Sequence, residues 1–181
     1  PCERACDLSA TNAGSDRRAV IDYNRCVDCG ACKIACPFGA IDDRSCMAQV
    51  IRELKDPDKR VYAILAPAFI GQFGAKIKPG QVMSAVSRLG FHAVEEVAFG
   101  ADITTIEEAK EFVATVPAER PYMTTSCCPA FVGLVEKHVP EVLPQVSSTF
   151  SPMMCGGSAI KNNDPDAIVV FIGPCVAKKR E

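Results

Sequence analysis

CVDCGACKIACP, residues 26–37, places four cysteines in a short loop and follows the last of them with a proline. The spacing C-x2-C-x2-C-x3-C-P is the ligand pattern of bacterial-type 4Fe–4S sites. Three thiolates of such a curling loop reach three irons of one cubane, and the fourth points away toward a second cluster. A structural zinc site is the alternative, but zinc ribbons use two separated pairs of cysteines. The run therefore predicts an iron–sulfur site.

A partial copy of the same pattern opens the chain. PCERAC supplies Cys2 and Cys6 at the spacing of the last two cysteines of a run, with Asp7 in place of the proline. The second cluster would keep Cys2 and Cys36 and would need two ligands before residue 1, so we expect a chain truncated inside a motif. Cross-ligation assigns four thiolates to the complete cluster: Cys6, Cys26, Cys29 and Cys32.

The overall composition argues against several classes of protein. The 181 residues are 48% hydrophobic, enough to bury a core in one or two domains. The 20 basic and 22 acidic residues leave a net charge of −2, which gives no electrostatic reason to expect nucleic acid or an anionic membrane surface as a partner. No apolar run is long enough for a membrane span, and no secretory signal opens the chain. The 11 cysteines are an odd number in a long apolar chain, which argues against a secreted disulfide protein.

Residues 1–44 are predicted to form a small α+β domain that holds two clusters. RRAVIDYN, residues 17–24, is a predicted strand because Val, Ile and Tyr favour a pleated surface. The segment has too few apolar residues to fold without metal, so we expect the clusters to be structural as well as functional.

From residue 45 onward, strand-like and helix-like patterns alternate. Thr104 and Glu107 form a capping-box pattern at the start of one helix. The alternation predicts an α/β domain over residues 45–181, with a parallel sheet and helices on both faces. Predicted strands are 61–67, 91–99, 121–126 and 167–173, and predicted helices are 46–56, 79–90, 104–116 and 129–138.

Three loops with unusual residues follow predicted strands: LAPAF at 65–69, TSCCP at 125–129 and GPCVAKK at 173–179. Ligands bind at the carboxyl edge of an open α/β sheet, so we expect Cys127, Cys128 and Cys175 to converge there. Neighbouring side chains on an extended chain point to opposite sides, so the two adjacent thiols should do different jobs. For Cys46 we expect the ordinary fate of a free cysteine, a small buried hydrophobic side chain.

These loops carry a family resemblance. TSCCPAF resembles the TSCCP motif of the iron-only ([FeFe]) hydrogenases, and GPCVAKKRE resembles their second motif. LAPA, ADITTIEEAKEF and SSTFSP also resemble segments of that family, so the resemblance covers a ferredoxin-like module and the first half of the catalytic domain. It implies reversible oxidation of dihydrogen at an H-cluster, a 4Fe–4S cubane bridged to a diiron unit with CO, cyanide and a dithiolate.

The resemblance also implies residue roles. Cys128 and Cys175 would ligate the cubane, and Cys127 would keep its proton and relay it to the dithiolate. Lys178 would donate to a cyanide, where a cation favours a buried anion. Ala66 and Pro67 would line the diiron pocket.

The implied proton path runs through Cys127, Glu108, Ser147 and Glu111. Glu108 and Glu111 are three positions apart on a predicted helix, so they can stand together. From the residues alone, a solvated helix face explains both carboxylates equally well.

Four departures from the family pattern indicate a divergent branch, one that could sense dihydrogen or oxidise it slowly. Gly173 replaces a methionine, Ala130-Phe131 replaces a small residue and Trp, Met153 replaces a glutamine, and Cys155 is additional. The chain ends before the family's third motif, a C-x3-C, so we expect this fragment alone to hold no H-cluster.

Three functional classes follow. The first is a cytoplasmic hydrogenase of an anaerobic organism, with a ferredoxin-type carrier and H-cluster maturation proteins as partners. The second is a non-catalytic relative that acts in iron–sulfur cluster assembly, which would not need a proton path to Cys127. The third is a simple electron carrier, which would not need the two thiol-bearing loops.

Overall fold

The computed structural model describes residues 1–16 and 18–181, and the chain forms two compact units. The cysteine unit comprises residues 1–44, 116–147 and 175–181, and the sheet unit comprises residues 45–115 and 148–174. The first segment therefore ends where the first predicted domain ends, whereas two later segments pack with it. The assignment of 45–181 to one domain stays a prediction.

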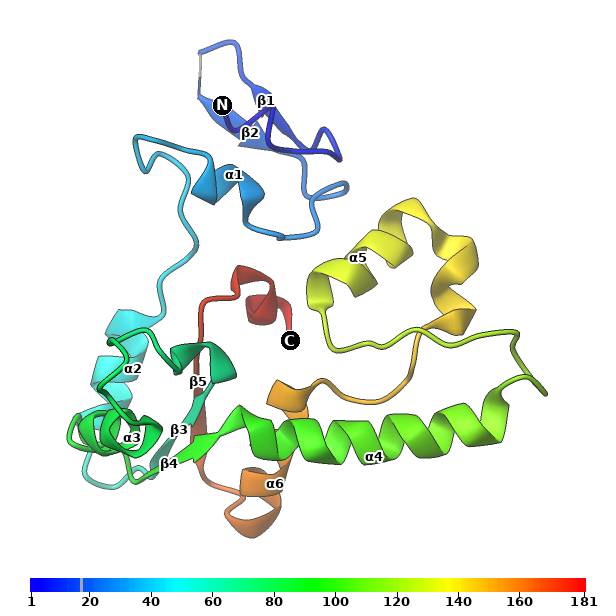
Figure 1. The fold of residues 1–181 in the computed structure, drawn as a ribbon. Coiled ribbons are helices and arrows are strands. Elements are labelled where there is room, and N and C mark those ends of the chain that lie inside the picture. Colours follow the sequence, from blue (N-terminus) through cyan, green and yellow to red (C-terminus); the bar gives the residue numbers. More distant parts are fainter. Residues whose placement is uncertain (17) are drawn as a thin grey trace. The chain divides into compact units, whose positions relative to one another are not determined.

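The sheet unit contains three parallel strands in the order β4-β3-β5 (Figure 1). The central strand is a continuous apolar run whose residues Ala63, Ile64 and Leu65 are at most 2% exposed. The parallel sheet and strands near 61, 93 and 168 are as predicted. The strands are β3 (Val61–Leu65), β4 (Ala93–Glu96) and β5 (Ile168–Ile172).

Helices cover both faces of this sheet (Figure 1). Val50 and Leu54 of α2 and Val86 of α3 pack with Val61 and its neighbours on one face. On the other face, α6 contacts β3 and β5. The elements are α2 (Met47–Leu54), η1 (Pro67–Phe69), α3 (Pro79–Ser87), α4 (Val97–Thr115) and α6 (Pro152–Asn163).

The prediction that a helix begins at Thr104 is wrong. Helix α4 begins directly after β4, and Thr104 lies in its middle, 4% exposed. Its Oγ1 is 3.0 Å from the carbonyl oxygen of Gly100 and 3.1 Å from that of Phe150. A threonine inside a helix can bond back to the carbonyl four residues earlier, so the hydroxyl is satisfied by packing and not by capping.

The prediction of a strand at residues 121–126 is also wrong. The segment makes one isolated parallel bridge, between Thr124 and Val146. The Thr124 amide donates to the carbonyl of Gln145 at 2.8 Å, and the Ser147 amide donates to the carbonyl of Thr124 at 2.8 Å. The partner is a turn segment of the cysteine unit, so the TSCCP loop does not follow a strand of the sheet.

The cysteine unit is built from short elements. The β2 strand lies inside the predicted strand 17–24, whose first residue, Arg17, is outside the described residues. Its elements are β1 (Thr11–Ala13), β2 (Ala19–Ile21), α1 (Ala31–Ile34), α5 (Pro129–His138), η2 (Pro140–Gln145) and η3 (Val176–Arg180), with β1 and β2 antiparallel.

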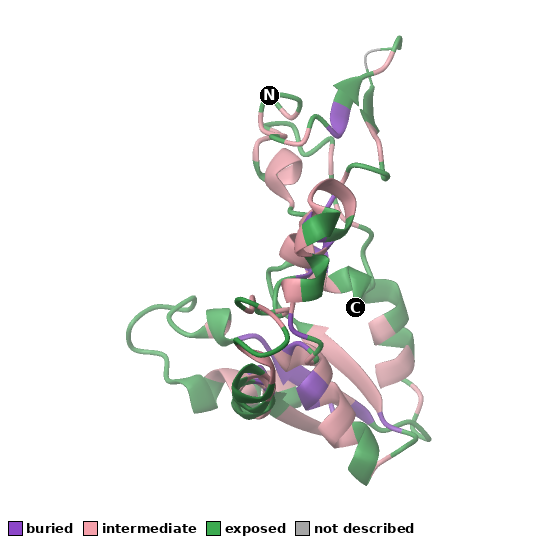
Figure 2. Cartoon of the chain, turned by 90° about the vertical axis from the view of Figure 1, so that its right-hand side faces the viewer, coloured by how far each residue is buried: buried purple, intermediate pink, exposed green. Residues whose placement is uncertain are grey.

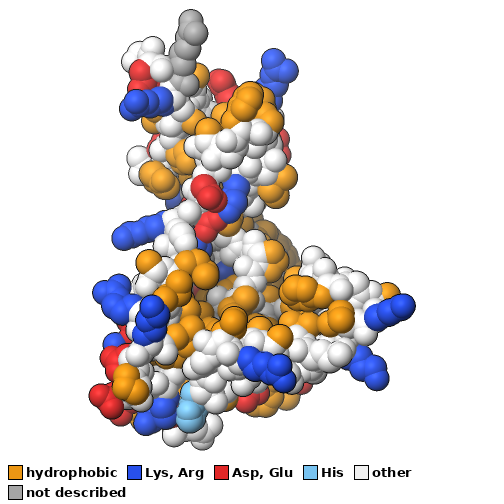
Figure 3. Space-filling model, turned by 90° about the vertical axis from the view of Figure 1, so that its left-hand side faces the viewer, with side chains coloured by type: hydrophobic (Ala, Val, Ile, Leu, Met, Phe, Trp, Pro, Cys, Tyr) orange, Lys and Arg blue, Asp and Glu red, His pale blue; other side chains and the backbone are white. Residues whose placement is uncertain are grey.

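Burial is unequal along the chain, and Figure 2 shows many of the buried residues in and around the sheet. Among the described residues of 1–44, only Ala10, Thr11 and Val27 are buried. Figure 3 shows exposed hydrophobic side chains interleaved with Lys, Arg, Asp and Glu on the face it presents. Within 1–16 and 18–181, the helices lack the combination of length and apolar character that crossing a membrane requires.

Two glycines allow α4 and α6 to approach closely. A Cβ on Gly100 would lie 2.1 Å from the carbonyl oxygen of Pro152 and 2.8 Å from the amide nitrogen of Gly156. Both atoms belong to backbone and cannot swing aside. The crossing therefore requires the absence of a side chain at position 100.

We predict that Gly100→Ala destabilises the sheet unit by about 1–3 kcal/mol or more, because overpacking against backbone forces the helices apart. Gly157→Ala is the matched control, since its Cβ would meet only Val169 Cγ1, at 3.9 Å. Helix propensity alone should make the control more stable by about 0.5–1 kcal/mol. Anaerobic urea unfolding followed by circular dichroism measures both, and equal midpoint shifts in the same direction would contradict the prediction.

Candidate metal centre

One cavity of about 640 Å³ lies within the cysteine unit. Its walls come from residues 5–43, from α5 through Ala130, Phe131 and Leu134, and from the carboxyl-terminal segment through Val176. The cysteines that line it are Cys6, Cys26, Cys29 and Cys32. These are the four thiols that cross-ligation assigns to one cluster.

The loop that carries Cys26, Cys29 and Cys32 is curled by its local backbone conformation. Asp28 and Gly30 both adopt positive φ, at 58° and 81°. Such left-handed residues turn the chain sharply, and glycine does so without steric cost. A Cβ on Gly30 would lie 2.9 Å from Val176 Cγ2, so the glycine also leaves room for the Val176 side chain, which lines the cavity.

Backbone amides point at two of these sulfurs. Ala10 N–H donates to Cys6 Sγ at 3.2 Å, and Asp28 N–H donates to Cys26 Sγ at 3.4 Å. Burial acts to raise the pKa of the Cys6 thiol, but amides including that of Ala10 outweigh it and leave this pKa below its usual value. The pKa of the Cys26 thiol is raised, first by burial and then by the charge of the Asp28 carboxylate, which the Asp28 amide only partly offsets.

The donor set fits an iron–sulfur cluster. Among the described residues, no three His, Cys, Asp or Glu side chains gather as a single metal ion would require. A cubane instead takes one thiolate per iron, so its ligands spread around a larger object. Amide-to-sulfur hydrogen bonds of the kind seen here are among the features that set cluster potentials. Cys6, Cys26, Cys29 and Cys32 would therefore hold a 4Fe–4S cluster.

The other two cysteines of the paired runs do not line this cavity. Cys2 is partly exposed, and Cys36 Sγ accepts a hydrogen bond from the Ala40 amide at 3.2 Å. The pKa of Cys36 is lowered, chiefly by backbone hydrogen bonding from Phe38 and then from Ala40. Their role in a second cluster stays a prediction.

The two thiol-bearing loops meet inside the cysteine unit. Cys128 immediately precedes α5 and Cys175 immediately precedes η3. Lys178, 13% exposed, donates through Nζ to the Cys127 carbonyl at 2.9 Å and to Glu181 Oε2 at 2.8 Å. The loops therefore converge through η3 and not through a shared sheet edge.

The three thiols of these loops, Cys127, Cys128 and Cys175, are all exposed. Cys127 Sγ lies 3.6 Å from Thr125 Oγ1. A Lys178 bond to a cyanide stays a prediction, as do the thiolate roles of the cysteines.

At the carboxyl edge of the sheet, the Ala66 amide donates to the Ile172 carbonyl at 2.9 Å. A Cβ on Gly173 would lie 2.6 Å from the Phe171 ring and 2.8 Å from Ala66 Cβ. A side chain at position 173 would therefore require Phe171 and Ala66 to shift. Pro67 follows Ala66 as the first residue of η1.

The predicted proton path is divided between the units. Cys127 and Ser147 belong to the cysteine unit, and Glu108 and Glu111 belong to the sheet unit. Ser147 is 5% exposed, and Glu108 is half-buried on α4.

Two hydroxyl residues that the sequence analysis missed bind Glu111. Its carboxylate accepts from the Ser148 amide at 3.1 Å, from Ser148 Oγ at 3.1 Å and from Thr149 Oγ1 at 3.3 Å. The run of three hydroxyl residues at 147–149 was the available signal.

The remaining two cysteines differ from each other. Cys46 is exposed at the start of α2, so the prediction that it is buried is wrong, because the contact of α2 with the core involves Val50 and Leu54 and does not extend to Cys46. Cys155 is buried, with Sγ 3.4 Å from Thr104 Oγ1 and 3.5 Å from the Phe150 carbonyl oxygen. Both contacts of the Cys155 sulfur are packing contacts between α6, α4 and the segment before α6.

This chain is similar to several known proteins. Iron hydrogenase 1 of Clostridium pasteurianum is 36% identical over 162 residues, which cover 80% of this chain and 28% of that protein. A probable cytosolic Fe-S cluster assembly factor of Nematostella vectensis is 28% identical over 196 residues, covering 91% of this chain and 44% of that protein. A solved [FeFe]-hydrogenase structure, from work on oxygen inactivation of the H cluster, has a TM-score of 0.65 at 31% identity, over 76% of this chain and 40% of that chain.

The chain spans less than half the length of each of these proteins. Residues 19–42 match a 4Fe-4S binding domain. Residues 59–181, more than half of the chain, match the iron only hydrogenase large subunit, C-terminal domain. With its thiol-lined cavity and its two converging cysteine loops, the chain belongs to the iron-only hydrogenase large-subunit family.

Proposed function

We propose that this chain is the electron-relay and first active-site portion of an enzyme that reversibly oxidises dihydrogen. Electrons would pass through 4Fe–4S clusters to or from a small ferredoxin-type carrier. Protein-bound 4Fe–4S clusters span low potentials that suit this exchange.

One observation carries the proposal. Residues one to three positions after each proposed cubane ligand form walls of the cavity that is lined by the four cluster thiols. Ala130 and Phe131 follow Cys128, and Val176 follows Cys175. The two redox sites would therefore lie near each other in the cysteine unit, as a relay from cluster to active site needs.

The chain's own residues have separate tasks in this proposal. Cys128 and Cys175 would supply thiolates to the cubane, and Lys178 would orient the Cys127 peptide through the hydrogen bond to its carbonyl. The H-cluster, when bound, would supply the metal centre at which dihydrogen is cleaved heterolytically. Ala66 and Pro67 would border that centre and exclude water.

Cys127 would hold and release a proton at Sγ, with Glu108, Ser147 and Glu111 carrying it onward. The bonds from Ser148 and Thr149 to Glu111 support this path, because they orient one of its carboxylates. A thiol is suited to the first position because its ordinary pKa is close enough to neutral for reversible transfer.

A second candidate is a non-catalytic role in iron–sulfur cluster assembly. The similarity to the Nematostella vectensis assembly factor favours it, as does the missing side chain at Gly173. Such a protein needs the cubane thiolates but no proton relay, so the two candidates differ in what Cys127 does.

The first prediction is that this chain binds one 4Fe–4S cluster through Cys6, Cys26, Cys29 and Cys32. Anaerobic reconstitution should yield about four irons at this site, by the stoichiometry of the cluster. Cys29→Ala should abolish the EPR signal of the reduced cluster, because a lost thiolate opens a coordination position. Cys46→Ala is the control, since Cys46 is exposed on the other unit, and an unchanged signal in Cys29→Ala would disprove the ligand set.

The second prediction concerns the proposed cubane ligands. In a full-length parent protein, Cys128→Ala and Cys175→Ala should each abolish the H-cluster spectrum while the cluster of the first prediction remains. Cys155→Ala provides the control, since its buried sulfur contacts Thr104 and the Phe150 carbonyl. A normal H-cluster spectrum in Cys175→Ala would remove that residue from the ligands.

The third prediction separates the two candidate functions. In a full-length parent, Cys127→Ala should keep the cubane iron and the CO and cyanide infrared bands but lose activity by about a hundredfold or more, as expected for a positioned acid–base group. Cys127→Asp should recover some activity, Cys127→Ser should recover less, and Glu108→Gln should behave like Cys127→Ala. Loss of the cubane would make Cys127 a ligand, and unchanged turnover would make it a packed thiol.

A further inference from the structure

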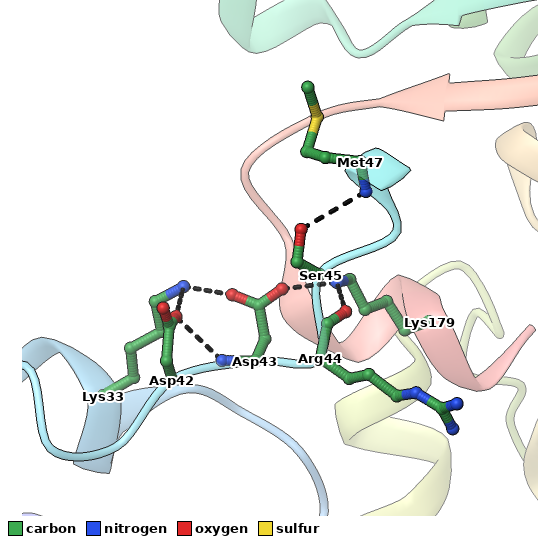
Figure 4. A network of polar contacts seen from close by, with 7 residues as sticks. All are labelled: Lys33, Asp42, Asp43, Arg44, Ser45, Met47 and Lys179. Atoms are coloured by element: carbon green, nitrogen blue, oxygen red, sulfur yellow. Dashed lines mark hydrogen bonds and ion pairs between the residues drawn. The ribbon is translucent and has the colours of Figure 1, made fainter. Parts of the chain in front are cut away.

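Two consecutive basic residues of η3 contact acidic residues of the cysteine loop. Lys179 Nζ donates to the Asp43 carboxylate and to the Arg44 carbonyl (Figure 4). Arg180 Nε lies 3.7 Å from Asp28 Oδ2. All of these residues belong to the cysteine unit.

The positions of these contacts along the chain are informative. Asp28 lies inside the cysteine run, between Cys26 and Cys29, and Asp43 lies just after the run. Lys179 and Arg180 follow Cys175 by a few residues. The segment that carries a proposed cubane ligand is therefore attached at two points, one inside the loop that carries three cluster thiols and one just after it.

The Arg180 guanidinium packs against α5 at Gly133. A Cβ on Gly133 would lie 2.1 Å from Arg180 Nη1, so the guanidinium crosses the helix at its glycine. Arg180 Nη2 also lies 3.6 Å from Glu136 Oε2. The side chain thus bridges Asp28 of the loop and Glu136 of α5, and α5 begins at the other proposed cubane ligand, Cys128.

The same loop is also held at the far end of α5. Lys137 Nζ donates to the Cys26 carbonyl at 2.6 Å and to the Tyr23 carbonyl at 2.8 Å, and His138 Nε2 is 2.8 Å from the Arg25 carbonyl oxygen. One helix therefore connects the Cys128 end with the backbone of the cluster loop.

Lys179 belongs to a small network of charged side chains. Lys179 and Asp43 are 39% and 26% exposed. Lys33 also pairs with Asp42 and Asp43, so two cations share two carboxylates (Figure 4). Lys179 first, and Lys33 second, hold the pKa of Asp43 well below its usual range, so this carboxylate stays charged at neutral pH.

We infer that Lys179 and Arg180 are positioning residues for electron transfer: they clamp the Cys175 segment to the cluster loop and so set the separation between the 4Fe–4S cluster and the cubane. This inference rests on the proposed function for the identity of the two metal sites. An isolated exposed ion pair contributes little, but here three ion pairs and a backbone contact act on one five-residue helix. Electron transfer depends on that separation, so loosening η3 should slow it without removing a ligand.

The test compares two lysines that share Asp43. Lys179→Gln removes a cation that joins η3 to the loop, whereas Lys33→Gln removes a cation whose contacts stay within residues 1–44. In the reconstituted chain, Lys179→Gln/Arg180→Gln should raise amide hydrogen exchange in residues 176–180 by about tenfold, as loss of local stability does. Iron content and cluster EPR should remain unchanged, and Lys33→Gln should leave exchange in 176–180 as it is.

A second measurement separates electron transfer from chemistry at the active site. In a full-length parent, the double variant should lose dye reduction by dihydrogen severalfold but keep exchange between dihydrogen and deuterated water, which needs no electrons from the relay. Asp43→Asn, which removes the carboxylate that Lys179 shares with Lys33, should act in the same direction and be non-additive with Lys179→Gln.

The outcomes are distinct. If amide hydrogen exchange in residues 176–180 is the same in the double variant and in Lys33→Gln, the clamp is overturned. It is also overturned if the double variant loses dye reduction and dihydrogen–deuterated water exchange to the same extent. Loss of cluster iron in the double variant also overturns it, because the residues would then be needed for cluster binding. Failure of the unaltered chain to bind iron would instead contradict the proposed function, and the comparison of exchange in 176–180 would still decide whether the clamp exists.

Discussion

The cysteine unit depends on one constraint: four thiols from two separate segments must line a single cavity. Residues 1–44 cannot meet it by packing, because among those described only Ala10, Thr11 and Val27 are buried. Segments from much later in the chain complete the walls. We therefore expect cluster binding to be coupled to the packing of α5 and η3 against residues 1–44. Such coupling is usual where a metal site substitutes for a hydrophobic core.

The sheet unit is organised differently, by close packing. Its central strand is apolar throughout, and two helices cross at glycine backbones so tightly that a methyl group at Gly100 has no room. The same tightness appears at the carboxyl edge, where the Phe171 ring and Ala66 occupy the space that a side chain at Gly173 would need. At Gly173, where the sequence departs from the family pattern, Phe171 and Ala66 thus fill the space beside the glycine.

Most regular elements follow from local pattern. The bounds of α5 are those of the predicted helix 129–138, since proline is favoured at the first helical position, and β3 lies within a continuous apolar run. Two of the failures share a cause. The capping-box pattern at Thr104 and the β-branched residues at 121–126 were local signals, and tertiary packing overrode both of them. The expected burial of Cys46 rested on a general tendency of free cysteines, and the core contact of α2 does not reach this residue.

The sequence alone determined the chemistry of the candidate ligands, because covalent spacing in CVDCGACKIACP limits which thiols can reach one cluster. It also determined the parallel sheet, through the alternation of apolar runs and helical patterns. Only the tertiary structure decided which segments enclose the thiols and which hydroxyls bind Glu111. Contacts such as Lys179 to Asp43, 136 positions apart, leave no local pattern, because each residue by itself is compatible with an ordinary solvated charge.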